Sequence, residues 1–128
     1  MSAPEKPAPT PLTREAILAA DDMLSEIVTV PEWGGGTIIV RGLTGEERDE
    51  FEASCIRGKG RKTEVNWRNA RAKLVVRSCY LPDGSRLFEE EDAPKLGKKG
   101  AAALNRVYEV AARLSGLTED DLEELAKN

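Results

Sequence analysis

The clearest hydrophobic pattern along the chain is a helical repeat near its C-terminal end. Between residues 100 and 115, apolar side chains recur every three or four positions, and charged side chains occupy positions between them. This spacing gathers the apolar side chains on one face and predicts an amphipathic helix from about Gly100 to Ser115. Gly116 then supplies a residue that can take the positive φ with which helices often end. The apolar residues of the repeat are Leu104, Val107, Tyr108, Ala111 and Leu114.

A second pattern, rich in β-branched residues, predicts a β-hairpin. The two strands are residues 27–30 and 37–43, and a loop with one proline and three glycines separates them. Trp33 lies in this loop, so we expect it at the tip of the hairpin. The triplet Gly34–Gly36 lacks the spacing of a phosphate-binding loop and precedes a strand rather than a helix, so a hairpin loop is the better interpretation.

Capping residues mark the starts of two shorter helices. Thr44 and Glu47 have the spacing of a capping box, in which each side chain accepts a hydrogen bond from the other residue's backbone N–H. A helix is therefore predicted from Gly45 to about Ile56. Thr13 is the candidate N-cap of an earlier helix over residues 14–26, which has a small apolar side.

The segment after residue 66 has apolar residues on more than one side. Asn66 is a candidate N-cap for a helix over residues 67–79, and such a helix would be buried between other elements. A strand over residues 74–81 is the alternative. Asp92 is predicted to begin a one-turn helix that ends at Leu96.

These elements predict an α+β fold that is mostly helical, with a small β-hairpin or sheet packed against four to five short helices. The chain has 128 residues, which is the size of one domain. Residues 1–12 are rich in proline and alanine and are predicted to be a disordered lead, followed by a single domain over residues 13–128. Within that domain, a last helix over residues 118–127 is predicted to be detachable.

The composition argues against an enzyme. The chain has no histidine, which excludes the usual Ser-His-Asp and Cys-His nucleophiles and a histidine-based zinc site. Its two cysteines cannot complete a four-ligand zinc site, so we expect reduced core thiols, no metal and no cofactor. No run of about 18 apolar residues is present for a membrane span, and no secretory signal is apparent. Cytoplasm is the predicted compartment.

The charge is unevenly distributed along the chain. Residues 56–80 carry eight basic and one acidic group, a balance of +7, whereas the flanking segments are acidic. A basic segment can bind nucleic acid through phosphates, although the acidic flanks would repel the same polyanion. A less favoured alternative is therefore a regulator that binds nucleic acid through the basic segment 57–77. The predicted basic patch comprises Arg57, Lys59, Arg61, Lys62, Arg68 and Arg71.

The succession of motifs resembles a known family. VTVPEWGG (28–35) is followed by VRGLTGEERDEFE (40–52), then by DGSRLFEEED (83–92) and by an alanine-rich helix that closes on LSGL (114–117). This order resembles the small tail assembly chaperones of long-tailed, siphovirus-type bacteriophages. The resemblance implies a protein that binds the tape measure protein and keeps it soluble until the tail tube polymerises. It also implies a longer, frameshifted form that would reach the tail tube protein, and it implies no catalytic residues.

Two regions are predicted to contact the partner: the hairpin and the last helix. The expected contact residues are Trp33, Val30, Ile39, Leu122 and Leu125. We also expect a homo-oligomer, because the apolar stripe of the last helix is too narrow to be buried alone. A structural head–tail connector or minor tail protein is the main alternative function, and it would remain in the finished particle.

Overall fold

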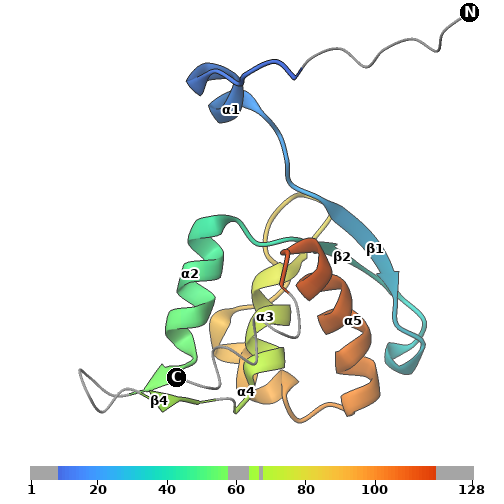
Figure 1. Ribbon diagram of the computed structural model, residues 1–128. Helices are drawn as coiled ribbons and strands as arrows, with labels where there is room; N and C mark the ends of the chain where they lie inside the picture. The colour runs from blue at the N-terminus through green and yellow to red at the C-terminus, as the bar shows by residue number, and fades with distance from the viewer. Residues whose placement is uncertain (1–8, 58–63, 67, 118–128) are drawn as a thin grey trace, which may run out of the picture.

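A three-stranded antiparallel sheet lies against a group of helices (Figure 1). The computed structural model describes residues 9–57, 64–66 and 68–117. The strands are β1 (Ser25–Thr29), β2 (Thr37–Arg41) and β5 (Cys79–Tyr80), in the spatial order β1-β2-β5. The predicted α+β class with several short helices is confirmed.

The first two strands form the predicted hairpin. In its register Ile27 lies opposite Ile39, and Val28 lies opposite Ile38. The connection is a short 3-10 helix, η1 (Pro31–Trp33), after which Gly34 and Gly35 take φ values of 82° and 76°. Only glycine adopts such values readily, so the triplet serves the turn, as the sequence predicts.

Helix α2 (Gly45–Ser54) begins with the predicted capping box. The Thr44 N–H donates to Glu47 Oε1 at 2.8 Å, and the Glu47 N–H donates to Thr44 Oγ1 at 3.1 Å. The helix ends two residues before the predicted end, because Ile56 and Arg57 form strand β3 (Ile56–Arg57). This strand pairs with β4 (Glu64–Val65) as a second, two-stranded sheet.

Helix α3 (Ala70–Ser78) starts later than predicted. Asn66 is not its N-cap, because β4 pairing holds the chain extended up to residue 65 and the Asn66 side-chain oxygen accepts the Arg68 N–H at 3.2 Å, before the helix begins. Asn69 occupies the cap position instead, with a φ of 61°. The sequence leaves open whether residues 74–81 form a helix or a strand. The structure contains both, because the helix ends at Ser78 and strand β5 begins at Cys79.

The C-terminal part of the described chain matches its prediction. A 3-10 turn, η3 (Glu90–Asp92), leads into the one-turn helix α4 (Ala93–Leu96). Helix α5 (Ala101–Leu114) has Gly100 and Ser115 as its caps, and Gly116 takes a φ of 70°. The predicted last helix over residues 118–127 lies outside the described residues.

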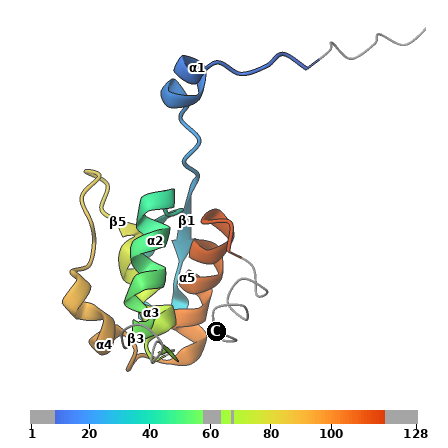
Figure 2. The same cartoon turned by 60° about the vertical axis from the view of Figure 1, so that its left-hand side comes forward.

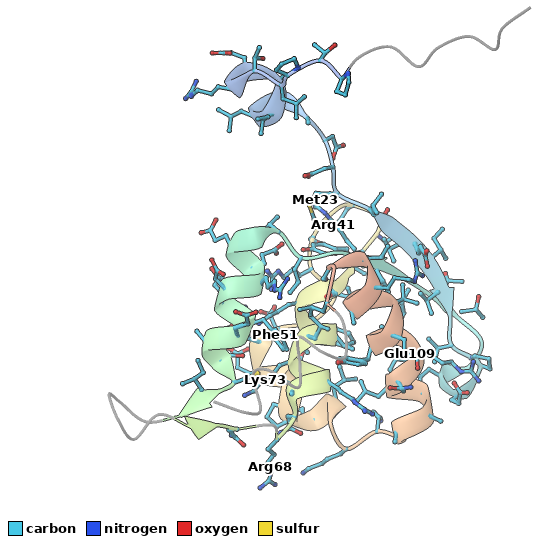
Figure 3. All side chains as sticks on the ribbon, in the orientation of Figure 1. Met23, Arg41, Phe51, Arg68, Lys73 and Glu109 are labelled. Atoms are coloured by element: carbon cyan, nitrogen blue, oxygen red, sulfur yellow. The ribbon has the colours of Figure 1, made fainter. Side chains whose placement is uncertain are left out.

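Helix α3 is the centre of the core. Seven of its nine residues are buried, because it packs against α5, α2 and α4. The sequence pattern of apolar residues on several sides of this segment is thereby explained. Phe51 reaches in from α2 and lies between α2 and α3 (Figure 3). The largest apolar side chains with at most 1% exposure are Phe51, Leu74, Val30, Val40, Val75, Val76 and Val107.

The end of β2 approaches the end of α5 very closely. A Cβ atom added to Gly42 would collide with the carbonyl oxygen of Leu114, and only glycine fits there. The next residue, Leu43, donates its N–H to Ser115 Oγ at 2.9 Å. This contact joins residues 72 positions apart and fixes the hairpin on α5.

The first helix stands apart from this body. Helix α1 (Arg14–Ala19) projects beyond the start of β1, and none of its residues is buried (Figure 2). Thr13 caps it as predicted, since its hydroxyl accepts the Ala16 N–H at 3.1 Å. The prediction of a helix through residue 26 is wrong, because the chain turns extended after Ala19 and enters the sheet at Ser25. No helix in the described parts of the chain is long and apolar enough to cross a membrane.

Candidate functional site

Exposed apolar side chains concentrate on the segment that leads into the sheet, residues 9–24, which we call the N-terminal arm. Of the eight large apolar side chains that are exposed among the described residues, four lie in the arm, and a fifth, Ile27, lies just after it in β1. A folded surface rarely leaves so many apolar side chains together in water unless another molecule covers them. The five and their exposed fractions are Leu12 (75%), Ile17 (55%), Leu18 (69%), Leu24 (63%) and Ile27 (72%).

The hairpin contributes less apolar surface than the sequence predicts. Val30 is 1% exposed and belongs to the core, so its predicted role as a contact residue does not fit the structure. Its side chain points inward because it shares the face of Val28 and Val40. Trp33 does lie at the tip, but it is half-buried and packs against the core, and Ile39 is also half-buried.

Two ion pairs hold the hairpin against α5. Arg113 donates to Glu26 at 2.7 Å, and Arg106 donates to Glu32 at 2.8 Å. The hydrogen bond from each arginine lowers the pKa of its glutamate below the ordinary value. Both pairs are open to water, so they orient the hairpin more than they stabilise the fold.

The sheet face that carries Ile27 also carries Ile39 and Tyr80, because the strand registers place these three residues in one cross-strand row. A polar corner closes the Tyr80 end of the row. The Tyr80 hydroxyl donates to Glu47 Oε2 at 3.4 Å, and Arg86 donates to the same oxygen at 3.0 Å. Burial and the nearby Glu47 charge raise the pKa of Tyr80. The apolar part of the row, Ile27 and Ile39, therefore lies at the end nearer the outer edge of β1.

The described part of the basic patch does not form one phosphate-binding surface. Arg68 is exposed and points away from the body (Figure 3), whereas Arg71 lies over the Tyr108 ring at 5.3 Å. Two further cations of the segment are used inside the fold: Lys73 donates to the carbonyl oxygen of Ser54, and Arg77 is buried. Three other patch residues, Lys59, Arg61 and Lys62, lie outside the described residues. The backbone of Arg57 is described, but its side chain is not.

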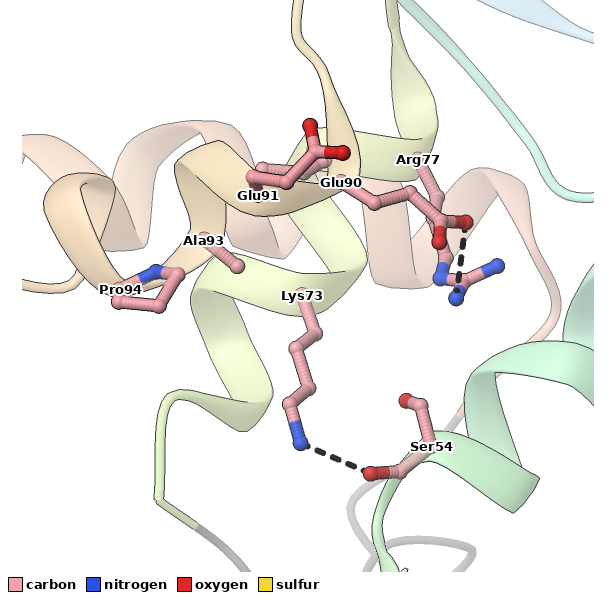
Figure 4. A pocket seen from close by; sticks show the side chains of 8 residues that line it. Ser54, Lys73, Arg77, Glu90, Glu91, Ala93 and Pro94 are labelled. Carbon is pink, nitrogen blue, oxygen red and sulfur yellow. Dashed lines mark hydrogen bonds and ion pairs between the residues drawn. The ribbon is translucent and has the colours of Figure 1, made fainter.

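An open cleft of about 290 Å³ lies between the end of α2, the middle of α3 and the η3–α4 segment (Figure 4). Arg77 crosses one side of it and pairs with Glu50 at 3.4 Å and Glu90 at 3.1 Å. These two carboxylates come from α2 and η3, so the guanidinium joins both walls to α3. The lining residues are Ser54, Lys73, Val76, Arg77, Glu90, Glu91, Ala93 and Pro94.

The thiols and acids do not assemble into a reactive centre within the described stretches. Cys55 and Cys79 are free and buried, as predicted, and burial raises the pKa of Cys79 to about 12. A thiol with such a pKa remains protonated at neutral pH and is a poor nucleophile. In the same stretches, no three acidic or sulfur side chains are grouped closely enough to hold a metal ion.

Comparison with known proteins identifies the family. A family model described as phage tail assembly chaperone matches residues 13–128. The chain belongs to the phage tail assembly chaperone family. No curated protein and no solved structure matches it. The predicted resemblance to tail assembly chaperones is thereby confirmed, and the match begins at Thr13, so it includes α1 and the part of the arm from residue 13 onward.

Sequence reasoning missed the arm as the most exposed apolar part of this chaperone. The sequence predicts that Ile17 and Leu18 form the small apolar side of a helix, but it does not predict that this side lies in solvent. The available signal was the strand pattern that starts at Ser25, because it leaves room for only a short helix followed by an extended linker. The predicted contact residues Leu122 and Leu125 lie outside the described residues.

Proposed function

We propose that this chaperone binds the tape measure protein in the host cytoplasm and keeps it soluble until the tail tube polymerises around it. In this proposal it acts by covering a polypeptide and not by catalysis. The observation that supports it is the N-terminal arm, which presents Leu12, Ile17 and Leu18 to solvent outside the body of the fold. A longer, frameshifted form would carry the contact to the tail tube protein.

The arm suits a helical client. A tape measure is a long and largely helical chain, and its uncovered apolar stripes would cause aggregation. A short helix can lie along such a stripe with its own apolar side chains inserted, in the manner of helix-in-groove recognition. Each buried leucine or isoleucine contributes about 1.5–3 kcal/mol before the entropy of ordering is subtracted. Three such side chains therefore give a weak individual contact.

Weak contacts are appropriate for a chaperone that must leave. Several copies bound along one client act together, because each bound copy raises the local concentration of the next. Tube subunits that polymerise along the client would then displace the copies one at a time, each against a modest free energy. Charged residues make up 33% of the chain. A surface this rich in charge would keep the complex soluble while the arms cover the client.

Co-expression with the tape measure protein of the same phage tests this proposal. The double variant Ile17→Asp/Leu18→Asp removes the apolar side of α1, and its thermal unfolding should match the wild type because neither side chain is buried. Wild-type chaperone should keep the tape measure in the soluble fraction, whereas the double variant should leave most of it in the pellet.

The matched control is Leu81→Asp/Leu87→Asp, which places the same two charges on exposed apolar positions of the body. This control should preserve solubility. Equal protection by both double variants would show that the arm does not bind the client. An insoluble tape measure in the presence of the wild-type chain would refute the proposed function itself.

A further inference from the structure

The outer edge of β1 is open to pairing. The backbones of Leu24 and Val30 hydrogen-bond toward β2, at 3.0 and 3.1 Å. Hydrogen bonding alternates along an antiparallel strand, so Ser25, Ile27 and Thr29 direct their N–H and C=O groups away from β2. In the described parts of the chain, no other strand pairs with this side of β1.

The sequence of β1 gives this edge little of the usual protection. Natural edge strands are blunted by short length, by proline, by charged side chains such as lysine, by a bulge or by a covering segment. The five-residue strand SEIVT has no proline or lysine, its one charged residue, Glu26, is paired with Arg113, and its register with β2 runs without a bulge from Ser25 to Thr29. Its central residue, Ile27, is 72% exposed. Such a strand is a template for another strand.

We propose that β1 pairs antiparallel with β1 of a second copy of this chain, around a twofold axis at Ile27. In this register Ile27 lies opposite Ile27 of the partner subunit, and Ser25 lies opposite Thr29 of the partner subunit. All three outward-facing residues of each strand are then used. The two three-stranded sheets become one continuous sheet, and the row that contains Ile27 and Ile39 continues into its copy across the seam.

The register along the seam is self-complementary, which favours a second copy as the occupant. Among the five paired residues of each strand it opposes no like charges, because Glu26 lies opposite Val28 of the partner subunit and is already held by Arg113. The small polar residues Ser25 and Thr29 face each other, and Ile27 meets its own copy. Beyond the strand, Asp22 comes opposite Glu32 of the partner subunit, whose charge is already paired with Arg106.

This pairing would make the chaperone bivalent, because one dimer carries two arms. The use of both arms on one client rests on the proposed function. Each arm precedes β1, so the two arms leave an antiparallel pair from opposite ends of the seam. Both arms stay free to contact one client. A pair of copies would therefore present two helices α1 on one rigid sheet.

Mass measurement on the purified full chain, without any other phage protein, tests the seam. Wild-type protein should sediment as a dimer at micromolar concentrations. Ile27→Pro removes only an outward N–H and leaves the β1–β2 ladder intact, and Ile27→Lys places two like charges opposite each other. Each should raise the dimer dissociation constant by at least about tenfold. The control Ile56→Lys, at an exposed apolar position of β3, should leave it unchanged.

Disulfide formation tests the register. In Ile27→Cys the two introduced thiols would lie on directly opposed residues, about 5.5 Å apart between Cα atoms, which suits a disulfide. In Thr29→Cys the equivalent residues would lie four positions apart along the seam, about 14 Å, which is too far. Cys55 and Cys79 are buried and should not compete.

A covalent dimer for Ile27→Cys and none for Thr29→Cys would support the proposal. A monomeric wild type, a dimer that survives both Ile27 variants, or equal cross-linking at both positions would overturn it. The client assay uses the α1 variants and the mass assay uses the β1 variants. Failure of the seam would therefore leave the tape measure proposal standing, and failure of the client assay would leave the seam standing.

Discussion

The close approach of β2 to α5 makes Gly42→Ala the most informative single substitution in the fold. The added methyl would collide with the Leu114 carbonyl oxygen and would lie 2.7 Å from its carbonyl carbon and 3.3 Å from the Ser115 nitrogen. All three atoms belong to backbone. Ordinary contact begins at 3.4 Å, so the strand and the helix end must separate by more than an ångström to relieve the collision with the carbonyl oxygen.

That separation has two costs. Overpacking of a buried site costs about 1–3 kcal/mol. Moving the two elements apart also weakens the hydrogen bond from the Leu43 N–H to Ser115 Oγ, which adds about 1 kcal/mol. We expect the free energy of unfolding to fall by about 2–4 kcal/mol, which for a chain of this size lowers Tm by about 8–16 °C.

Urea and thermal unfolding followed by far-ultraviolet circular dichroism measure the effect, with two glycine variants as controls. Gly45→Ala adds a methyl in the first turn of α2 with no atom within 4 Å, so stability should be unchanged or rise by less than about 1 kcal/mol. Gly97→Ala meets the Asn69 side chain, which can rotate away, so its loss should be smaller than that of Gly42→Ala. A Gly42→Ala protein within about 0.5 kcal/mol of wild type, or no more affected than Gly97→Ala, would refute the reasoning.

Three further predictions concern charge and thiol chemistry. Arg77→Ala removes a buried guanidinium that pairs with Glu50 and Glu90; since both carboxylates can rehydrate, urea unfolding should show a loss of about 1–3 kcal/mol, less than for a fully buried pair. Partial burial raises the pKa of Glu47, but its hydrogen bonds and the neighbouring arginines outweigh this effect and hold the pKa below its ordinary value. The stability lost in Glu47→Gln should therefore be largest above about pH 6 and should shrink as the pH falls toward about 3. A difference in stability that does not change with pH would contradict this prediction. The buried thiol of Cys79, with a pKa of about 12, should react with an aromatic disulfide reagent only after denaturation, and rapid labelling of the native protein would show that the core opens.

The elements that the sequence predicts well are those specified by neighbouring residues. The capping box at Thr44 and Glu47 and the apolar repeat of α5 each involve contacts within a few positions, and the structure shows both as expected. The hairpin is local in the same sense, because its glycines make the turn between adjacent strands.

What sequence reasoning missed depends on contacts between distant segments. The start of α3 shifts to Ala70 because β4 pairs with β3 and holds the chain extended up to residue 65. The two-residue strand β5 exists only because β2 offers it an edge. The candidate site shows the same dependence on distant contacts. Val30 is an apolar residue in the hairpin, so the sequence predicts that it contacts the partner, but the hairpin register directs its side chain into the core.

The extended linker between α1 and the sheet determines how far the arm can reach from the body. Residues 20–22 are exposed, and the chain joins the sheet at Leu24, whose carbonyl oxygen accepts the Gly42 N–H at 3.0 Å. Five extended residues span at most about 16–18 Å, which equals about three turns of an α-helix. In the function proposed above, an arm with that reach would find apolar stripes at irregular intervals, and a tape measure could lengthen or diverge in sequence during evolution without matching a fixed repeat.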